Sequence, residues 1–189
     1  MNITEKLRQQ LLVTRPNLNS LELSLVKPEN VYNDMNIRGR IAEALVYKWL
    51  SSVPVDFINE FPETPDGAKW KKTPHGIVVS SGFTKREFDF VFNYEGSPFI
   101  AEVKSLDING ITSKIPESIS IAQDYFQTDV SMILFFPIYS NKVNDKIQIE
   151  EQFPQVKCVD IGYKKKQLKN CLIKYHKMLA ESQKKAYQQ

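Results

Sequence analysis

The sequence predicts an α/β domain in which a mixed β-sheet is flanked by helices. Three observations predict this class: an amphipathic helical pattern at residues 36–53, a series of apolar segments of strand length between residues 55 and 163, and a lysine-rich helical stretch at the end. Helices before, between and after strands are typical of layered α/β or α+β domains. The expected order is helix, three strands, helix, strand, strand, helix.

Each element follows from a local pattern. Ile37, Ile41, Leu45 and Trp49 share one face of the first clear helix, which Pro54 ends. A continuous apolar run at 131–139 is typical of a buried strand. Short helical patterns are expected at 3–13 and 20–26, strands at 55–61, 77–80, 87–93, 99–105, 131–139 and 157–163, a turn-rich loop at 62–76, and helices at 116–127 and from Lys164 onward.

Length and composition predict one soluble globular domain. The chain has 189 residues, of which 42% are hydrophobic and 25% charged, and it contains no repeat and no low-complexity linker. We expect a single domain over 1–189, with a core at about 36–163, an N-terminal helical segment at 1–35 and a basic C-terminal helix at 164–189. The charged N-terminus does not resemble a secretory signal, and the apolar run at 132–139 is too short to span a bilayer. A cytoplasmic protein without a membrane partner is therefore expected.

The cysteines exclude two classes of site. Only Cys158 and Cys171 occur, without CxxC spacing, so neither a disulfide framework nor a thiolate zinc site is predicted. We expect two reduced thiols, at least one of them packed.

Charge is unevenly distributed along the chain. The segment from Lys164 to Gln189 holds eight lysines and one acid, about +7, whereas the whole chain carries +3. A basic helix on an acidic body is either a phosphate-binding surface or a solvated amphipathic helix. Four of its lysines are our candidates for nucleic-acid binding: Lys164, Lys165, Lys166 and Lys169.

Residues 87–105, EFDFVFNYEGSPFIAEVKS, read as a β-hairpin. If it turns about Glu95-Gly96 with a loop of two or four residues, Asp89 lies across from Glu102, and Glu87 lies opposite Lys104. Directly opposed carboxylates repel unless something positive lies between them. A divalent cation with oxygen ligands, Mg²⁺ in particular, fits such a pair.

Lys104 lies on the same strand face as Glu102, where its ammonium can orient a water or offset charge on a phosphate. The alternative is a solvated strand on which Lys104 pairs with Glu87 or Glu102.

Asp89, a twelve-residue gap, and then Glu102-Val103-Lys104 resemble the core motif of the PD-(D/E)XK nucleases, the restriction-endonuclease-like superfamily, with Phe88 where the motif usually has proline. The resemblance implies an αβββαβ core, a catalytic metal held by Asp89 and Glu102, and a lysine that assists the attacking water. It also implies a Mg²⁺-dependent enzyme that hydrolyses DNA, with Mn²⁺ able to substitute.

The helix NIRGRIAEALVYKWL resembles the RxGxxxE-type helix of archaeal Holliday junction resolvases, with Gly39 before Glu43. This resemblance implies that Glu43 is a third metal and catalytic carboxylate. The chain departs from the family in the spacing after Gln123, so that the role of this residue stays open, and in its longer loop at 62–76.

That loop carries a second candidate nucleic-acid surface, in which an aromatic side chain stacks on a base or sugar while lysines hold phosphates. Its residues are Lys69, Trp70, Lys71 and Lys72. The alternative is a small satellite core around Trp70.

Several questions stay open in the sequence. A restriction enzyme, a junction or repair nuclease and a mobile-element nuclease are all compatible with it, as are a homodimer and a partner protein subunit. A non-catalytic nucleic-acid-binding or assembly module with a nuclease-like fold is the alternative function. A third interpretation is an α/β protein whose charged hairpin face is merely solvated.

Overall fold

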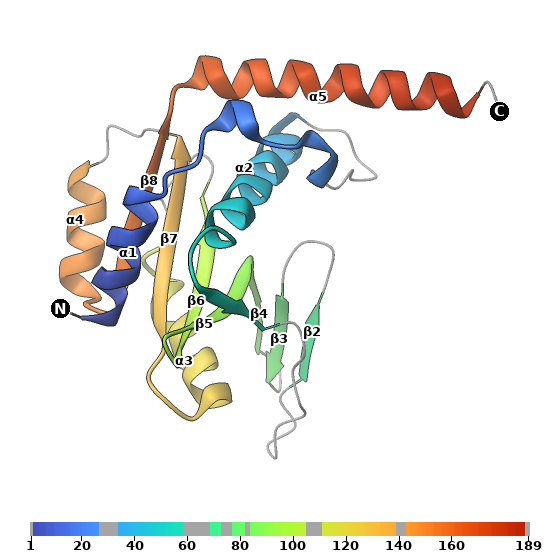
Figure 1. The fold of residues 1–189 in the computed structure, drawn as a ribbon. Coiled ribbons are helices and arrows are strands. Elements are labelled where there is room, and N and C mark those ends of the chain that lie inside the picture. Colours follow the sequence, from blue (N-terminus) through green and yellow to red (C-terminus); the bar gives the residue numbers. More distant parts are fainter. Residues whose placement is uncertain are drawn as a thin grey trace.

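A computed structural model describes residues 2–26, 34–58, 69–72, 77–81, 84–104, 111–138 and 143–187. The described chain has three layers, with a five-stranded sheet between two groups of helices (Figure 1). This confirms an α/β fold with a mixed sheet flanked by helices. The helices are α1 (Ile3–Val13), α2 (Asp34–Leu50), α3 (Ile115–Phe126), α4 (Val143–Gln152) and α5 (Lys165–Ala186), with short 3₁₀ turns η1 (Leu18–Ser20) and η2 (Leu23–Leu25).

The larger sheet has the strand order β1-β5-β6-β7-β8. β1 and β6 both run antiparallel to β5, whereas β6, β7 and β8 are parallel to one another. The parallel strands therefore end at the same edge of the sheet. The strands are β1 (Val55–Phe57), β5 (Phe90–Tyr94), β6 (Ser97–Val103), β7 (Ser131–Ile138) and β8 (Val156–Tyr163).

A smaller antiparallel sheet of order β2-β3-β4 lies beside the larger one (Figure 1). Its strands are β2 (Lys69–Lys72), β3 (Ile77–Ser81) and β4 (Thr84–Phe88). The loop expected at 62–76 thus contains a strand, because the backbone of Lys69–Lys72 pairs with β3.

The single strand expected at 87–93 was wrong. A bend at Asp89 separates β4 from β5, and the two strands belong to different sheets. Glu87 consequently pairs with Val78 of β3 and not with Lys104.

Alternation along the strands divides the core between the two faces of the larger sheet. On one face, Phe92, Phe99, Ala101 and Phe135 pack with α1, α2 and α5; on the other, residues such as Ile100 pack with α3 and α4. Burying a large apolar side chain contributes roughly 1.5–3 kcal/mol, so both faces hold helices firmly.

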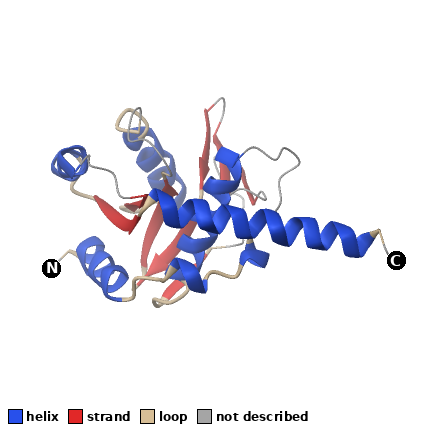
Figure 2. Cartoon of the chain, turned by 90° about the horizontal axis from the view of Figure 1, so that it is seen from above, coloured by secondary structure: helices blue, strands red, loops and turns tan. Residues whose placement is uncertain are grey.

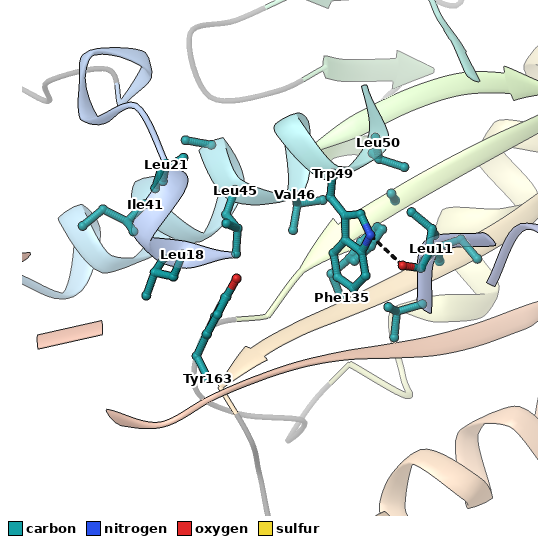
Figure 3. Packing of buried hydrophobic residues seen from close by; sticks show 14 of the residues in the cluster. Leu11, Leu18, Leu21, Ile41, Leu45, Val46, Trp49, Leu50, Phe135 and Tyr163 are labelled. Carbon is teal, nitrogen blue, oxygen red and sulfur yellow. Dashed lines mark hydrogen bonds between the residues drawn. The ribbon is translucent and has the colours of Figure 1, made fainter. Parts of the chain in front are cut away.

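Trp49 connects the N-terminal helix to this core. Its indole ring lies 5.5 Å from the ring of Phe135, and its Nε1 donates a hydrogen bond of 2.8 Å to the carbonyl of Leu11 in α1 (Figure 3). The bond satisfies a carbonyl in the last turn of α1 that has no partner within the helix.

The turn about Glu95-Gly96 confirms the predicted hairpin register. Tyr94 pairs with Ser97 and Phe90 with Ala101, which leaves a two-residue loop. Glu95 and Gly96 both have positive φ, 49° and 78°. Positive φ at both central residues is the requirement of a type I′ hairpin turn, which glycine meets without steric cost.

Other expected boundaries hold approximately, with two exceptions. In place of the helix expected at 20–26 the chain has the 3₁₀ turn η2, with η1 just before this segment. Helix α4 was not predicted, because its apolar period is weak: Ile149 is buried, whereas Ile147 is 49% exposed. It forms the crossover between β7 and β8, which parallel strands require.

Both cysteines are buried and reduced, as expected. Burial raises the pKa of the Cys158 thiol to about 12 and also raises the pKa of Cys171. Within the described residues, no helix combines the length and apolar character needed to cross a membrane.

Two glycines provide opposite tests of this backbone. Gly39 is inside α2, and an added Cβ would meet no atom within 4 Å, whereas Gly96 has a φ of +78°. We expect Gly39→Ala to stabilise the fold by about 0.5–1 kcal/mol, through helix propensity, and Gly96→Ala to destabilise it by about 1–2 kcal/mol. Urea unfolding of the two variants measures both changes, and equal effects would contradict the assigned turn.

Candidate active site

Asp89 accepts a hydrogen bond from a main-chain amide at the point where two strands separate. The β5–β6 ladder ends at the pair Phe90–Ala101, and beyond it the chain bends at Asp89 toward the smaller sheet. The amide of Val103 donates a hydrogen bond of 2.6 Å to Asp89 Oδ2. A buried main-chain amide without a partner would be costly, so the carboxylate replaces the missing strand. This bond fixes Asp89 beside the end of β6.

Glu102 and Lys104 project from that same end of β6. Glu102 pairs with Leu134 of β7, and the amide of Lys104 donates to the carbonyl of Phe135 at 2.9 Å. Their side chains, 14% and 32% exposed, form an ion pair with 2.5 Å between Nζ and Oε2. Residues two apart on a strand share a face, which explains the contact. The structure thus contains the ion pair between Lys104 and Glu102 that the sequence offered as one alternative.

Glu43 comes from the middle of α2, not from its first turn, which argues against a role in capping the helix dipole. It forms an ion pair with Arg40 one turn earlier, and its side chain is 23% exposed. The neighbouring positions Val46 and Leu50 are buried. Arg40 was not among the predicted site residues, although its spacing of three from Glu43 is a helical pairing visible in the sequence.

The charges of Glu102 and Glu43 both act on the Asp89 carboxyl. Burial raises the pKa of the Asp89 carboxyl well above its ordinary range, and the negative charges of Glu102 and then Glu43 raise it further. The hydrogen bond from Val103 and the charge of Lys104 act in the opposite direction but do not compensate. The structure therefore brings together Glu43, Asp89, Glu102 and Lys104, which come from α2, the β4–β5 bend and β6.

The donor set suits a hard divalent cation, although the carboxylates already have partners. Among the described residues, no three His, Cys, Asp or Glu side chains are grouped as a set of metal ligands. Glu43 pairs with Arg40, Asp89 with the Val103 amide and Glu102 with Lys104. Magnesium sites commonly use only one or two protein carboxylates together with water and substrate phosphate oxygens. Asp89 and Glu102 meet that requirement, and the raised pKa of Asp89 marks where positive charge is lacking.

Helix α5 begins at the edge of the sheet where β6, β7 and β8 end. Lys164 directly follows β8, two strands away from β6, and lies five residues beyond Val159, which is level with the end of β6 through the pairs Val103–Phe135 and Phe135–Val159. It is therefore displaced from the end of β6 by about 10 Å across the sheet and by roughly 15 Å along the strands. Figure 2 shows the helix crossing the body and extending beyond it, and every described residue after Leu179 is exposed. Lys164, Lys166 and Lys169 are also exposed.

For two sets of predicted positions the structure describes the backbone but not the side chains. The backbone of Lys69, Trp70, Lys71 and Lys72 forms β2, but their side chains lie outside the described part of the structure, as does the side chain of Lys165. Gln123 is in the last turn of α3, where its carbonyl accepts a hydrogen bond of 2.8 Å from the amide of Gln127. Between the described residues, no hydrogen bond or ion pair links the Gln123 side chain to the three acids.

No protein-family model matches the sequence, and none of the curated proteins matches it. The structure is similar to that of protein VC1899 from Vibrio cholerae, at 13% identity and a TM-score of 0.41, over 90% of this chain and 53% of that one. It is also similar to Can2 from Sulfobacillus thermosulfidooxidans in complex with cyclic tetra-adenylate, at 19% identity and a TM-score of 0.42, over 91% of this chain and 48% of that one. The chain spans about half the length of each of these proteins.

The raised pKa of Asp89 predicts a specific dependence of stability on pH. In the folded state this carboxyl holds its proton more tightly than at its ordinary pKa of 3.8, so the free energy of unfolding falls as the pH rises from that value to the raised one. Asp89→Asn keeps an acceptor for the Val103 amide and removes the charge. Without metal it should be more stable than the parent at pH 7, by about 1.4 kcal/mol for each unit of the pKa shift.

Urea unfolding in EDTA from pH 4 to pH 8 measures this effect. Asp56→Asn, in the exposed middle position of β1, is the matched control and should follow the parent at every pH. Parallel profiles for the parent and Asp89→Asn would contradict the assignment.

Proposed function

We propose that this chain is a metal-dependent nuclease that hydrolyses phosphodiester bonds in DNA, on a core of the restriction-endonuclease-like kind. One observation supports it above the others: two acids from separate elements, Glu43 and Glu102, lie near the desolvated carboxyl of Asp89, and Lys104 pairs with Glu102. Such an arrangement costs stability, and strongly perturbed acids of this kind are common at catalytic sites. The motif Asp89…Glu102-Val103-Lys104, which resembles that of metal-dependent nucleases, indicates the chemistry that this group of residues supports.

In this proposal Asp89, Glu102 and Glu43 hold Mg²⁺, or Mn²⁺ in its place. When bound, the cation polarises the phosphate and stabilises the leaving oxygen. The chain's own residues do the remaining work. The Val103 amide fixes Asp89, while the ion pair with Arg40 orients Glu43. Lys104 donates from its ammonium to the attacking water or to a phosphate oxygen, and so offsets charge that develops in the transition state.

DNA is the proposed substrate because of the motif resemblance, and the basic start of α5 supports a polyanion. Lys164, Lys166 and Lys169 are exposed at the start of α5, beyond the end of β8 and on the side of the sheet toward which β6 also runs, so in this proposal they hold phosphates of a DNA strand whose cleaved bond lies at the acids. Without such a surface the acidic remainder of the chain would repel the substrate from its own site.

A non-catalytic nucleic-acid-binding or assembly module is the second candidate. It is favoured by the pairing of each acid within the chain, with Arg40, the Val103 amide and Lys104. Cleavage assays on linear, supercoiled, branched and single-stranded DNA with Mg²⁺ or Mn²⁺ decide between the candidates. If none of these substrates is cleaved, the nuclease proposal is rejected.

Removing charge at the acids should remove the ion and the reaction together. We expect Asp89→Asn and Glu102→Gln each to lose Mn²⁺ binding in calorimetry and to reduce plasmid cleavage by more than about 100-fold. Lys104→Ala should keep Mn²⁺ binding and lose turnover, because its role lies in the transition state. Lys157→Ala is the matched control, since this strand lysine also pairs with a glutamate, Glu150, at 3.3 Å.

The control should cleave as the parent does. Normal Mn²⁺ affinity in both acid variants would remove Asp89 and Glu102 from the ligands. Full activity of Lys104→Ala would leave this lysine only a partner of Glu102.

The start of α5 should govern affinity and not chemistry. Replacing Lys164, Lys166 and Lys169 with Gln should weaken binding to all DNA sequences alike and reduce the slope of log affinity against log salt by up to about three units. Cleavage at saturating DNA and low salt should persist. The matched control replaces Lys174, Lys177 and Lys184 farther along the helix and should leave the slope unchanged; equal slopes in both variants would mean that DNA binds elsewhere.

A further inference from the structure

Three partly exposed aromatic rings lie on the elements that carry Glu43 and follow Asp89. Tyr47 of α2, Phe57 of β1 and Phe90 of β5 contact one another, with ring centroids 5.2 Å apart for Tyr47–Phe57 and 6.3 Å apart for Tyr47–Phe90 and Phe57–Phe90. We call these three residues the aromatic platform. The exposed fraction of Tyr47 is 47%, although it is one of the largest side chains in the chain.

The platform and the candidate active site share two structural elements. Tyr47 follows Glu43 by four residues on α2, so both side chains lie on one face, about 6 Å apart along the helix. Phe90 is the residue after Asp89 and pairs with Ala101, the residue before Glu102. The shared elements thus place Tyr47 near Glu43 and the bend at Asp89, whereas alternation along β6 puts Glu102 on the face of Ile100.

The platform continues an aromatic cluster from the core. Phe57 lies 6.3 Å from the ring of Phe92, which is fully buried and stacks on Phe99 at 5.5 Å with only 4° between the planes. Ring planes of Tyr47 and Phe90 differ by 29°. The outermost ring is thus supported from below by packed side chains, and little side-chain freedom is lost when something stacks on it.

We propose that Tyr47, on this platform, stacks an unpaired base next to the phosphate held at Glu43, Asp89 and Glu102. Bases inside a duplex are already stacked on both sides, so only a single-stranded, terminal or flipped-out base can lie on a protein ring. The substrate class is therefore DNA with an unpaired segment at the cleaved position. This inference rests on the proposed nuclease function for the position of the phosphate.

A purely structural role is the competing explanation, since the same rings close the edge of the sheet at β1. Tyr47→Leu separates the two explanations because it retains apolar cover and removes the ring, whereas Tyr47→Phe retains both. Tyr187→Leu is the matched control, because this tyrosine is 92% exposed and lies at the far end of α5.

The experiment measures fluorescence anisotropy of labelled single-stranded dT20 and of a blunt 20-base-pair duplex, in EDTA and at fixed low salt, together with Mg²⁺-dependent cleavage of the same DNAs by the parent. Tyr47→Leu should weaken dT20 binding roughly 5- to 100-fold and leave duplex binding and the unfolding midpoint unchanged. Tyr47→Phe and Tyr187→Leu should bind as the parent does. Unchanged dT20 binding in Tyr47→Leu, or equal loss for dT20 and duplex, would overturn the platform even if the parent cleaves DNA. A selective loss of dT20 binding in a chain that cleaves no DNA would support base stacking by Tyr47 while rejecting the nuclease.

Discussion

The hydrogen bond from the Val103 amide to Asp89 is the interaction on which the candidate site depends. Residues 84–94 serve two sheets, and the chain must bend where it passes from β4 to β5. The bend leaves the outer side of β6 without a strand beyond Ala101, and the Asp89 carboxylate satisfies the exposed amide. Asp89 thus lies where the β5–β6 ladder ends and the two sheets separate. The same hydrogen bond fixes its carboxylate beside the end of β6. A shorter or neutral apolar residue at this position would leave Val103 without its partner.

The three acids near this bond differ in how their negative charges are compensated. Glu43 and Glu102 each have a cation two or three residues away, Arg40 and Lys104, so their charges are balanced locally. Asp89 accepts a hydrogen bond from a neutral amide and remains desolvated near two negative groups, whose effect on its pKa the charge of Lys104 does not offset. It is therefore the group that gains most from a proton or a cation. Folds that retain such a cost at one point commonly do so for function.

The architecture directs other features toward the same edge of the sheet. Because β6, β7 and β8 are parallel, their ends lie together, and the crossover by α4 and the return of the chain into α5 follow from that direction. The lysines at the start of α5 follow the end of β8, and the aromatic ring of Tyr47 lies one turn from Glu43 on α2. In open α/β sheets, the region outside the carboxyl ends of the strands is the usual place for ligands.

The sequence by itself determined the layered α/β class, most helices and strands, and the hairpin register, because alternation and the Glu95-Gly96 turn are local properties. It also indicated Asp89, Glu102 and Lys104 as one group, since register alone brings their positions together. Only the tertiary structure decided that β4 and β5 part at Asp89, because FDFVF alternates without interruption and no local pattern shows that 84–88 pairs with β3 whereas 90–94 pairs with β6. The weak period of α4, the approach of Glu43 to Asp89 and the stacking of Tyr47 on Phe57 and Phe90 were likewise decided by packing between elements, which no local pattern encodes.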